Sequence, residues 1–272
     1  MSREPLDIAS AERAARFAVL RAALGTAAPT ASSTVAQERA VSLGEPTLDR
    51  ALGNLPTVAV HEVVPESRCD VAAATGFLLA LVLALKRNGE AGTRPILWVT
   101  RRSGLYEAGA LSGRGLVECG IDPSHFLLAA GHRDTDVLWA LEEAARSGAV
   151  APAVGEVASA DLKATQRLAF AARAHGVPIL LLRSARGLGP SVARSRWGIA
   201  AAPSIPPRLG PYAPGRVCWR VTLEKGWRER PQSWLLEWDD ATHSLRLATA
   251  LADHPVVADT AKEGRATTRR HG

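Results

Sequence analysis

The sequence predicts an α/β protein: a mostly parallel central sheet flanked by helices, followed by an antiparallel hairpin. Two observations lead to this prediction. Short, β-branched apolar runs alternate along the chain with longer segments of helical periodicity, a pattern typical of parallel βαβ units. Towards the carboxyl end, two runs alternate polar and apolar residues on either side of a turn, which favours antiparallel pairing.

Residues 1–25 form a predicted amphipathic helix. Phe17, Leu20 and Leu24 recur with alanines at three- and four-residue spacing, and Gly25 ends the pattern. Residues 26–40 are rich in Ala, Thr and Ser and form a predicted flexible linker. The apolar stripe of the helix needs a surface to cover it. It either binds a partner or folds back on its own body, and both interpretations remain open.

Residues 58–86 are the centre of the predicted core domain, which spans residues 41–250. A β-branched strand over 58–64 leads into a polar turn over 65–70 and an apolar helix over 71–85. A strand, a six-residue turn and a buried helix form the frame of a phosphate-binding loop. A working loop needs Gly-x-x-x-x-Gly-Lys-Ser/Thr, because glycines let backbone amides surround phosphate while the lysine neutralises it and the hydroxyl holds magnesium.

The residues that this chemistry requires are absent from the frame. The two glycine positions hold Val64 and Cys69, the lysine position holds Asp70, and the hydroxyl position holds Val71. A carboxylate in place of an ammonium group reverses the sign of the interaction with phosphate. The sequence therefore predicts a degenerate loop that binds no nucleotide, made of Val64, Pro65, Glu66, Ser67, Arg68, Cys69, Asp70 and Val71.

The remaining predicted elements continue the βαβ alternation to the hairpin. The expected strands cover 96–100, 126–130, 150–157 and 179–182, with another soon after Val192 and a short one in 245–250. The expected helices cover 105–119, 135–147 and 162–175. The hairpin pairs 217–223 with 233–239, and its tryptophans are expected in the core rather than against a cofactor. Residues 251–272 form a predicted mobile tail with a basic end.

The turn resembles a known family. Val64-Pro65-Glu66-Ser67 is similar to the Gly-Pro-Glu-Ser that opens the phosphate loop of RecA recombinases, and residues 43–56 resemble the approach to that loop. A RecA-like body with a degenerate loop, together with the tryptophan-bearing segments 97–99, 138–143 and 233–239, resembles the ImuA family. That family consists of bacterial accessory proteins of damage-induced mutagenesis, and the resemblance covers roughly residues 40–250.

The resemblance implies a RecA-like fold without catalysis and without a cofactor. In the RecA pattern the strand over 96–100 ends in a glutamate that polarises water, whereas here Thr100-Arg101-Arg102 follows. The place of the magnesium-binding Asp holds Gly155-Glu156. The implied partners are an inactive Y-family polymerase homologue, an error-prone DNA polymerase and RecA. Two alternatives remain: a divergent RecA-like ATPase, and a cell-division inhibitor resembling SulA.

The net charge of +6 is unevenly distributed. Between Arg183 and Arg230 ten Lys/Arg stand against two acids, whereas the rest of the chain is nearly neutral. Such a band attracts DNA weakly and without sequence preference, or an acidic face of a protein. The candidate residues for this surface are Arg183, Arg186, Arg194 and Arg196.

Composition narrows the remaining functional classes. The three cysteines lack zinc-ligand spacing and are expected to be reduced core thiols, so the sequence predicts no metal site. The first residues carry acids and no long apolar stretch, which argues against a signal peptide. The apolar run over 71–85 is shorter than the roughly 20 residues of a membrane span. A cytoplasmic protein without membrane contact is expected.

Overall fold

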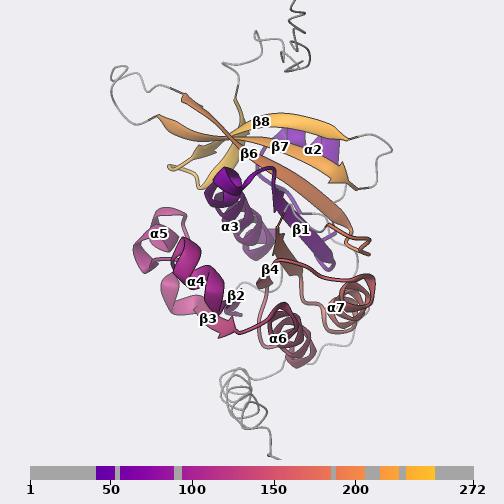
Figure 1. Cartoon of the computed structure of the whole chain (residues 1–272). Helices are drawn as coiled ribbons and strands as arrows, with labels where there is room; N and C mark the ends of the chain where they lie inside the picture. Colours follow the sequence, from indigo (N-terminus) through magenta and orange to yellow (C-terminus); the bar gives the residue numbers. More distant parts are fainter. Residues whose placement is uncertain are drawn as a thin grey trace, which may run out of the picture.

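A computed structural model of the chain describes residues 41–52, 56–88, 94–184, 188–205, 215–226 and 231–248. The predicted amino-terminal helix and linker and the predicted tail lie outside these residues. In the described part, nine strands form one sheet in the order β3-β2-β4-β5-β1-β6-β7-β8-β9 (Figure 1). The neighbours β2 and β3, β4 and β5, and β1 and β6 all pair in parallel, so crossover connections build the first half of the sheet.

The sheet changes from parallel to antiparallel at β6. The parallel strands are β1 (Val60–Pro65), β2 (Ile96–Arg101), β3 (Phe126–Gly131), β4 (Ala153–Val157), β5 (Ile179–Arg183) and β6 (Ser195–Ile205). Antiparallel pairing then joins β6 to β7 (Arg216–Lys225), β8 (Gln232–Asp239) and β9 (Ser244–Leu247). The predicted mostly parallel sheet and its carboxyl-terminal hairpin are confirmed.

Helices cover both faces of the parallel strands (Figure 1). Successive residues of a strand point to opposite faces, so each strand supplies two cores. On one face, α3 (Val71–Asn88) packs with Val63 and Leu180. On the other, α6 (Asp134–Ser147) and α7 (Leu162–His175) pack with Val60 and Leu181. The short α2 (Pro46–Leu52) adds Leu48 to the first core.

The apolar helix α3 is the central core helix. The α3 run from residue 77 to residue 85 is buried throughout, because β1, β5, β6 and β9 all lie against the helix. Its length and apolar composition would also suit a membrane span, but its side chains pack against the sheet in the first core. This burial is the pattern of a core helix in an α/β domain.

Tryptophans of the antiparallel half complete the first core, as predicted. The rings of Trp197 and Trp219 lie 5.6 and 6.4 Å from the ring of Phe77, and Trp238 continues the row at 6.3 Å from Trp219. Gly76 lets α3 approach this row closely, since a Cβ there would lie 3.0 Å from the Trp219 ring. These aromatic rings therefore join the antiparallel strands to the helix that follows the degenerate loop.

The helix expected over residues 105–119 is wrong as a single element. The structure has α4 (Arg102–Ala108) and α5 (Gly113–Glu118). Gly109 separates them with a φ of 80°, a left-handed conformation that favours glycine and ends α4. Ser112 then caps α5 by accepting a hydrogen bond from the Gly115 amide, and a 3-10 turn over Pro123–His125 leads into β3.

Candidate functional site

The candidate site is the junction between β1 and α3, where a phosphate loop would bind nucleotide. β1 ends at Pro65, a 3-10 turn follows over Arg68–Asp70, and α3 begins at Val71. The predicted strand, turn and helix are therefore present in the predicted order. Ser67 caps the turn with an extended backbone, and its side chain accepts a hydrogen bond from the Cys69 amide.

The Asp70 carboxylate accepts hydrogen bonds both within this turn and from β6. One oxygen accepts hydrogen bonds from the Ser67 amide at 3.0 Å and the Ser67 hydroxyl at 2.5 Å. The other accepts from the Ala201 amide of β6 at 2.8 Å. These hydrogen bonds hold the pKa of Asp70 below its usual value, with the Ser67 hydroxyl as the largest cause. The carboxylate is thus kept ionised inside the loop.

Three other amides of the loop are also bonded within the protein. The Glu66 amide donates to the Ile199 carbonyl at 2.8 Å, and the Asp70 amide donates to the Ser67 carbonyl at 3.1 Å. Together with the Ser67 and Cys69 amides, four loop N–H groups have intramolecular acceptors. A phosphate would have to displace these bonds and stand beside an ionised carboxylate.

An ion pair ties the loop to the antiparallel half of the sheet. The Glu66 carboxylate accepts a hydrogen bond from Arg220 of β7 at 2.7 Å, and this contact raises the pKa of Arg220. The loop therefore contacts both β6 and β7. Arg220 places a positive charge beside the loop, but this charge is paired with the Glu66 carboxylate.

Glu156 and Thr100, which stand where the RecA pattern has its metal-binding and water-polarising acids, contact each other. Glu156, at the end of β4, accepts hydrogen bonds from the Trp98 indole at 2.5 Å and the Thr100 hydroxyl at 2.8 Å. Both carboxylate oxygens of Glu156 thus have donors from β2. Among the residues that the structure describes, no group of three or more His, Cys, Asp or Glu side chains could hold a metal ion.

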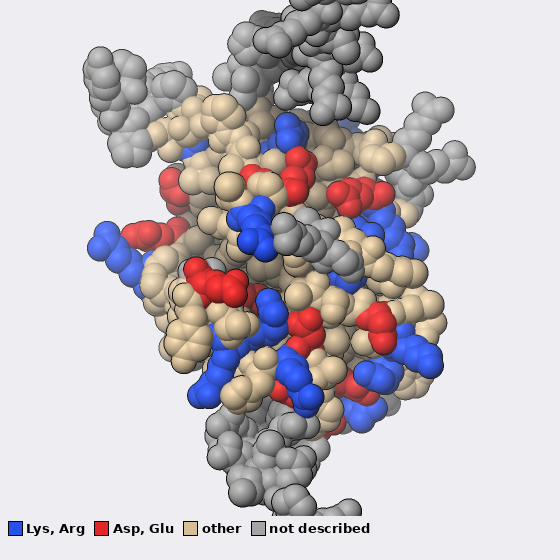
Figure 2. Space-filling view, viewed as in Figure 1, with Lys and Arg blue, Asp and Glu red and all other residues tan. Residues whose placement is uncertain are grey.

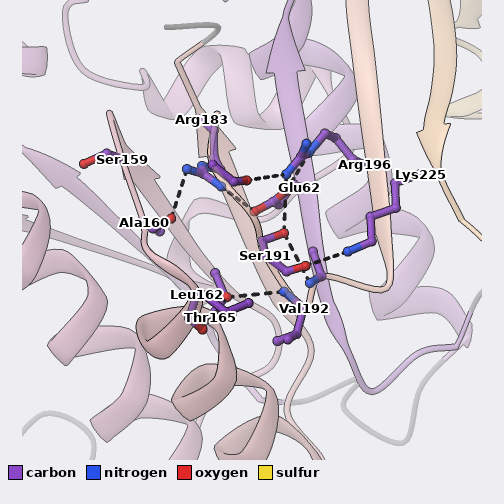
Figure 3. A network of polar contacts seen from close by, with 12 residues as sticks. Glu62, Ser159, Ala160, Leu162, Thr165, Arg183, Ser191, Val192, Arg196 and Lys225 are labelled. Atoms are coloured by element: carbon purple, nitrogen blue, oxygen red, sulfur yellow. Dashed lines mark hydrogen bonds and ion pairs between the residues drawn. The ribbon is translucent and has the colours of Figure 1, made fainter. Parts of the chain in front are cut away.

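A buried ion network lies beside the loop on the face covered by α7 (Figure 3). Glu62 of β1 accepts from Arg183 of β5 at 2.7 Å and from Arg196 of β6 at 2.8 Å. The Glu62 and Arg183 side chains have no exposed surface. Arg183 also donates to the Ala160 carbonyl at 3.1 Å, while its buried Nε atom has no hydrogen-bond partner.

The network also fixes the connection between β5 and β6. The Arg196 guanidinium donates to the Ser191 hydroxyl at 3.4 Å, and Lys225 of β7 donates to the Ser191 carbonyl at 2.6 Å (Figure 3). The Val192 amide donates to Thr165 of α7. The part of the connection around residues 191–192, where a RecA-like protein would carry a DNA-binding loop, is thus attached to two strands and a helix.

The predicted basic surface is corrected by these contacts. Arg183 cannot face DNA or a partner, because it is 1% exposed and neutralised by Glu62. Arg196 is largely occupied by the same carboxylate, with 17% of its side chain exposed. Arg194 is exposed, and none of the carboxylates in the described ranges pairs with it. Arg186 lies outside the described residues.

The structure also pairs two further arginines of this band with carboxylates. Arg216 pairs with Glu237 at 3.0 Å and Arg220 with Glu66 at 2.7 Å, and both carboxylates come from outside residues 183–230. On the face of the molecule in Figure 2, Lys and Arg side chains are interspersed with Asp and Glu rather than gathered in a band. Among the described residues, the charge count along the sequence therefore treated as free four arginines that the structure pairs with carboxylates.

The other predicted site residues have different outcomes. The degenerate-loop residues are brought together at one junction, as the sequence indicated. Phe17, Leu20 and Leu24 lie outside the described residues. The expectation of three core thiols is wrong for Cys69, which is exposed, whereas Cys218 is buried.

Sequence reasoning missed Glu62 as the centre of the ion network. Its signal was visible: Glu62 is the one acid in the buried, mostly apolar strand Val60–Pro65, a context in which a carboxylate requires a buried partner. The partners Arg183 and Arg196 are more than 120 residues away in sequence, so their identity depends on strand order. Arg220, which pairs with Glu66, was missed for the same reason.

Comparison with known proteins gives a specific relationship. No protein-family model matches the chain. The chain is 34% identical over 240 residues to Protein ImuA of Caulobacter vibrioides strain NA1000 / CB15N, an alignment that covers 80% of this chain and 92% of the relative. Protein ImuA of the Caulobacter vibrioides strain ATCC 19089 / CIP 103742 / CB 15 gives the same identity and coverage.

Proposed function

The chain belongs to the ImuA family of accessory proteins in damage-induced mutagenesis, and from this premise we propose that it is a non-catalytic, RecA-like component of SOS-induced translesion DNA synthesis. It acts in the cytoplasm through protein partners rather than by turning over nucleotide. Its proposed partners are an inactive Y-family polymerase homologue and an error-prone DNA polymerase, with RecA as a third.

The observation that carries the non-catalytic part is the Asp70 carboxylate inside the loop. It accepts the hydrogen bonds of the Ser67 and Ala201 amides and introduces negative charge where a triphosphate would need positive charge. Glu156 is held by Trp98 and Thr100 in the place of a metal ligand. The loop thus supports a structural role, in which it joins β1 and α3 to the antiparallel strands.

The strand arrangement supports the RecA-like part of the proposal. The degenerate loop follows β1, which lies inside the parallel sheet between β5 and β6. α3 covers one face, and α6 and α7 cover the other. In open α/β sheets, ligands bind at the carboxyl ends of such inner strands. This protein keeps that architecture and fills the position with its own side chains.

Reconstitution tests the proposed partners. The purified chain is mixed separately with the inactive Y-family polymerase homologue, the error-prone polymerase, RecA and a cell-division protein, and complexes are measured by sedimentation. We expect a complex with at least one of the two polymerase components and none with the division protein. Binding to the division protein alone would support the SulA-like alternative and reject the proposal.

A genetic experiment separates binding from nucleotide chemistry. A strain lacking the gene is complemented with wild type, with Ser67→Ala or with Asp70→Asn, and damage-induced mutation frequency is measured. Both variants should restore mutagenesis wherever the protein accumulates normally, because neither residue serves catalysis. If a variant accumulates normally and still binds the polymerases but fails to restore mutagenesis, the degenerate loop would instead have a catalytic role.

A further inference from the structure

The outward face of α7 presents an apolar and basic surface. Its exposed side chains include Leu162, Lys163, Arg167, Phe170 and Arg173, which we call the α7 outer face. Phe170 is 78% exposed and Leu162 is 40% exposed. Lys163, Arg167 and Phe170 follow each other at spacings of four and three residues, so they lie along one side of the helix.

The fold itself does not require Phe170. The inner side of α7 supplies its core contacts through Ala164, Leu168, Ala171 and Ala172. Asp161 caps the amino end of the helix by accepting from the Ala164 amide, and Gly176 ends it in a left-handed conformation. Core packing and capping thus define α7 without the outward aromatic ring, which leaves about four fifths of its surface in water.

The charged side chains that α7 itself exposes beside Phe170 are all basic. No acid lies between Leu162 and His175. Arg167 lies 3.4 Å from Glu142 of α6, a carboxylate that Arg146 also contacts at 2.7 Å. Lys163 and Arg173 have no carboxylate partner in the part of the chain that the structure describes. The surface around the exposed ring is therefore cationic.

We propose that the α7 outer face docks an acidic surface of a protein partner, with Phe170 inserted into an apolar pocket on that partner. This inference rests on the proposed function, in which the chain acts through proteins. Aromatic and arginine side chains are the residues that most often anchor interfaces, and a cationic rim selects an acidic counterpart. Leu162 favours a protein over a nucleic acid, because an aliphatic side chain has no aromatic face on which a base stacks.

The test compares Phe170→Ala with Tyr106→Ala, which truncates an aromatic ring on α4 that is at least as exposed, at 88%. The probes are the purified Y-family polymerase homologue and the error-prone polymerase, titrated by calorimetry against the full chain. We expect Phe170→Ala to weaken Kd by about tenfold or more and Tyr106→Ala to change it by less than about twofold. Equal affinities of Phe170→Ala and wild type would overturn the inference.

Charge reversal gives an independent readout. The double variant Lys163→Glu/Arg173→Glu should weaken binding and flatten its dependence on salt, because fewer screened ion pairs remain. Arg114→Glu on α5 is the matched control, since the Arg114 side chain is 90% exposed and lies outside the α7 outer face. An unchanged salt dependence in the double variant would contradict the acidic partner.

Two further measurements test whether the chain itself or a nucleic acid, rather than an acidic protein, covers the α7 outer face. The melting temperature of the isolated chain should be the same for Phe170→Ala and wild type, and a fall of several degrees would show that the chain itself covers the ring. A single-stranded oligonucleotide whose binding depended on Phe170 would assign the face to nucleic acid and overturn the inference. If wild type binds neither polymerase, the proposed function and this inference fall together, whereas binding that is insensitive to Phe170 rejects this inference alone.

Discussion

Glu62 and Arg183 form an ion pair of 2.7 Å in which neither side chain is exposed to solvent. They stand on the adjacent strands β1 and β5, on the face that α7 covers. Arg196 adds a second hydrogen bond to the same carboxylate from β6. Two arginines that the sequence assigned to a basic surface therefore hold three neighbouring strands together.

Removing the Arg183 partner of this ion pair should strongly destabilise the fold. Arg183→Met leaves the buried Glu62 with only the Arg196 contact, and loss of one partner of a buried pair costs about 3–5 kcal/mol. Urea unfolding of the variant and wild type measures the difference. The double variant Glu62→Leu/Arg183→Met should recover part of the loss, because the uncompensated carboxylate is gone and only Arg196, which is partly exposed, is left without that acceptor. A single variant as stable as wild type would show that solvent reaches Glu62.

The hydrogen bonds of Asp70 in the capping box with Ser67 should give stability a distinct dependence on pH. The pKa of Asp70 is lowered in the folded protein, so the stabilisation is present above the pKa of unfolded Asp and is lost as pH falls through the lower folded value. Asp70→Asn should unfold more easily than wild type by about 1 kcal/mol at neutral pH. The difference in unfolding free energy between Asp70→Asn and wild type should disappear under strongly acidic conditions. Arg68→Ala, in the same turn, is the control and should match wild type at every pH.

His61 should make the protein sensitive to mild acid. Its Nε2 lies 3.1 Å from the Pro56 carbonyl, which only accepts, and its Nδ1 lies 2.8 Å from the Ser195 hydroxyl. Complete burial lowers its pKa from 6.5 to about 4, so the folded protein keeps the ring neutral.

The unfolded chain therefore binds this proton at higher pH than the folded chain, and stability falls as pH drops from about 6.5 to about 4. The total loss through His61 is roughly 3 kcal/mol, with no further His61 contribution at lower pH. His61→Gln should show a smaller loss over the same interval in denaturant titrations. Parallel pH curves for the two proteins would reject this assignment.

Nucleotide should bind very weakly. Asp70 repels a triphosphate, and Val64 and Cys69 lack the backbone freedom of glycine. Titration with a fluorescent ATP analogue should give a Kd weaker than about 1 mM and no dependence on magnesium. Asp70→Lys alone should not create binding, since the other three consensus positions remain unsuitable. Micromolar, magnesium-dependent binding by wild type would contradict the prediction.

DNA binding should be weak, independent of sequence and sensitive to salt. Arg194 is the exposed residue of the candidate set within the described ranges, so Arg194→Ala should reduce the salt slope by at most about one unit. Fluorescence anisotropy with two oligonucleotides of different sequence measures the slopes. Arg196→Ala is unsuitable for this purpose, because it also removes the hydrogen bond that Arg196 donates to Glu62. Nanomolar binding at physiological salt would contradict the prediction.

The sequence alone determined the alternation of strands and helices, the hairpin and the degenerate loop. These features depend on periodicity and on the residues allowed at a few consecutive positions, both of which are local properties. It also identified Asp70 as incompatible with phosphate. Tertiary structure showed that Asp70 has a structural use, because the Ala201 amide that it binds belongs to a strand 131 residues away.

Only tertiary structure decided which charges are available at the surface. The net charge of a sequence window counts Arg183 and Arg196 as free cations, whereas the strand order places both beside the carboxylate of Glu62. The tertiary structure likewise leaves Phe170 in solvent while burying Trp197 and Trp219. The physical reason is that burial and ion pairing depend on neighbours from distant segments, and those neighbours are set by strand order and helix packing rather than by the sequence around each residue.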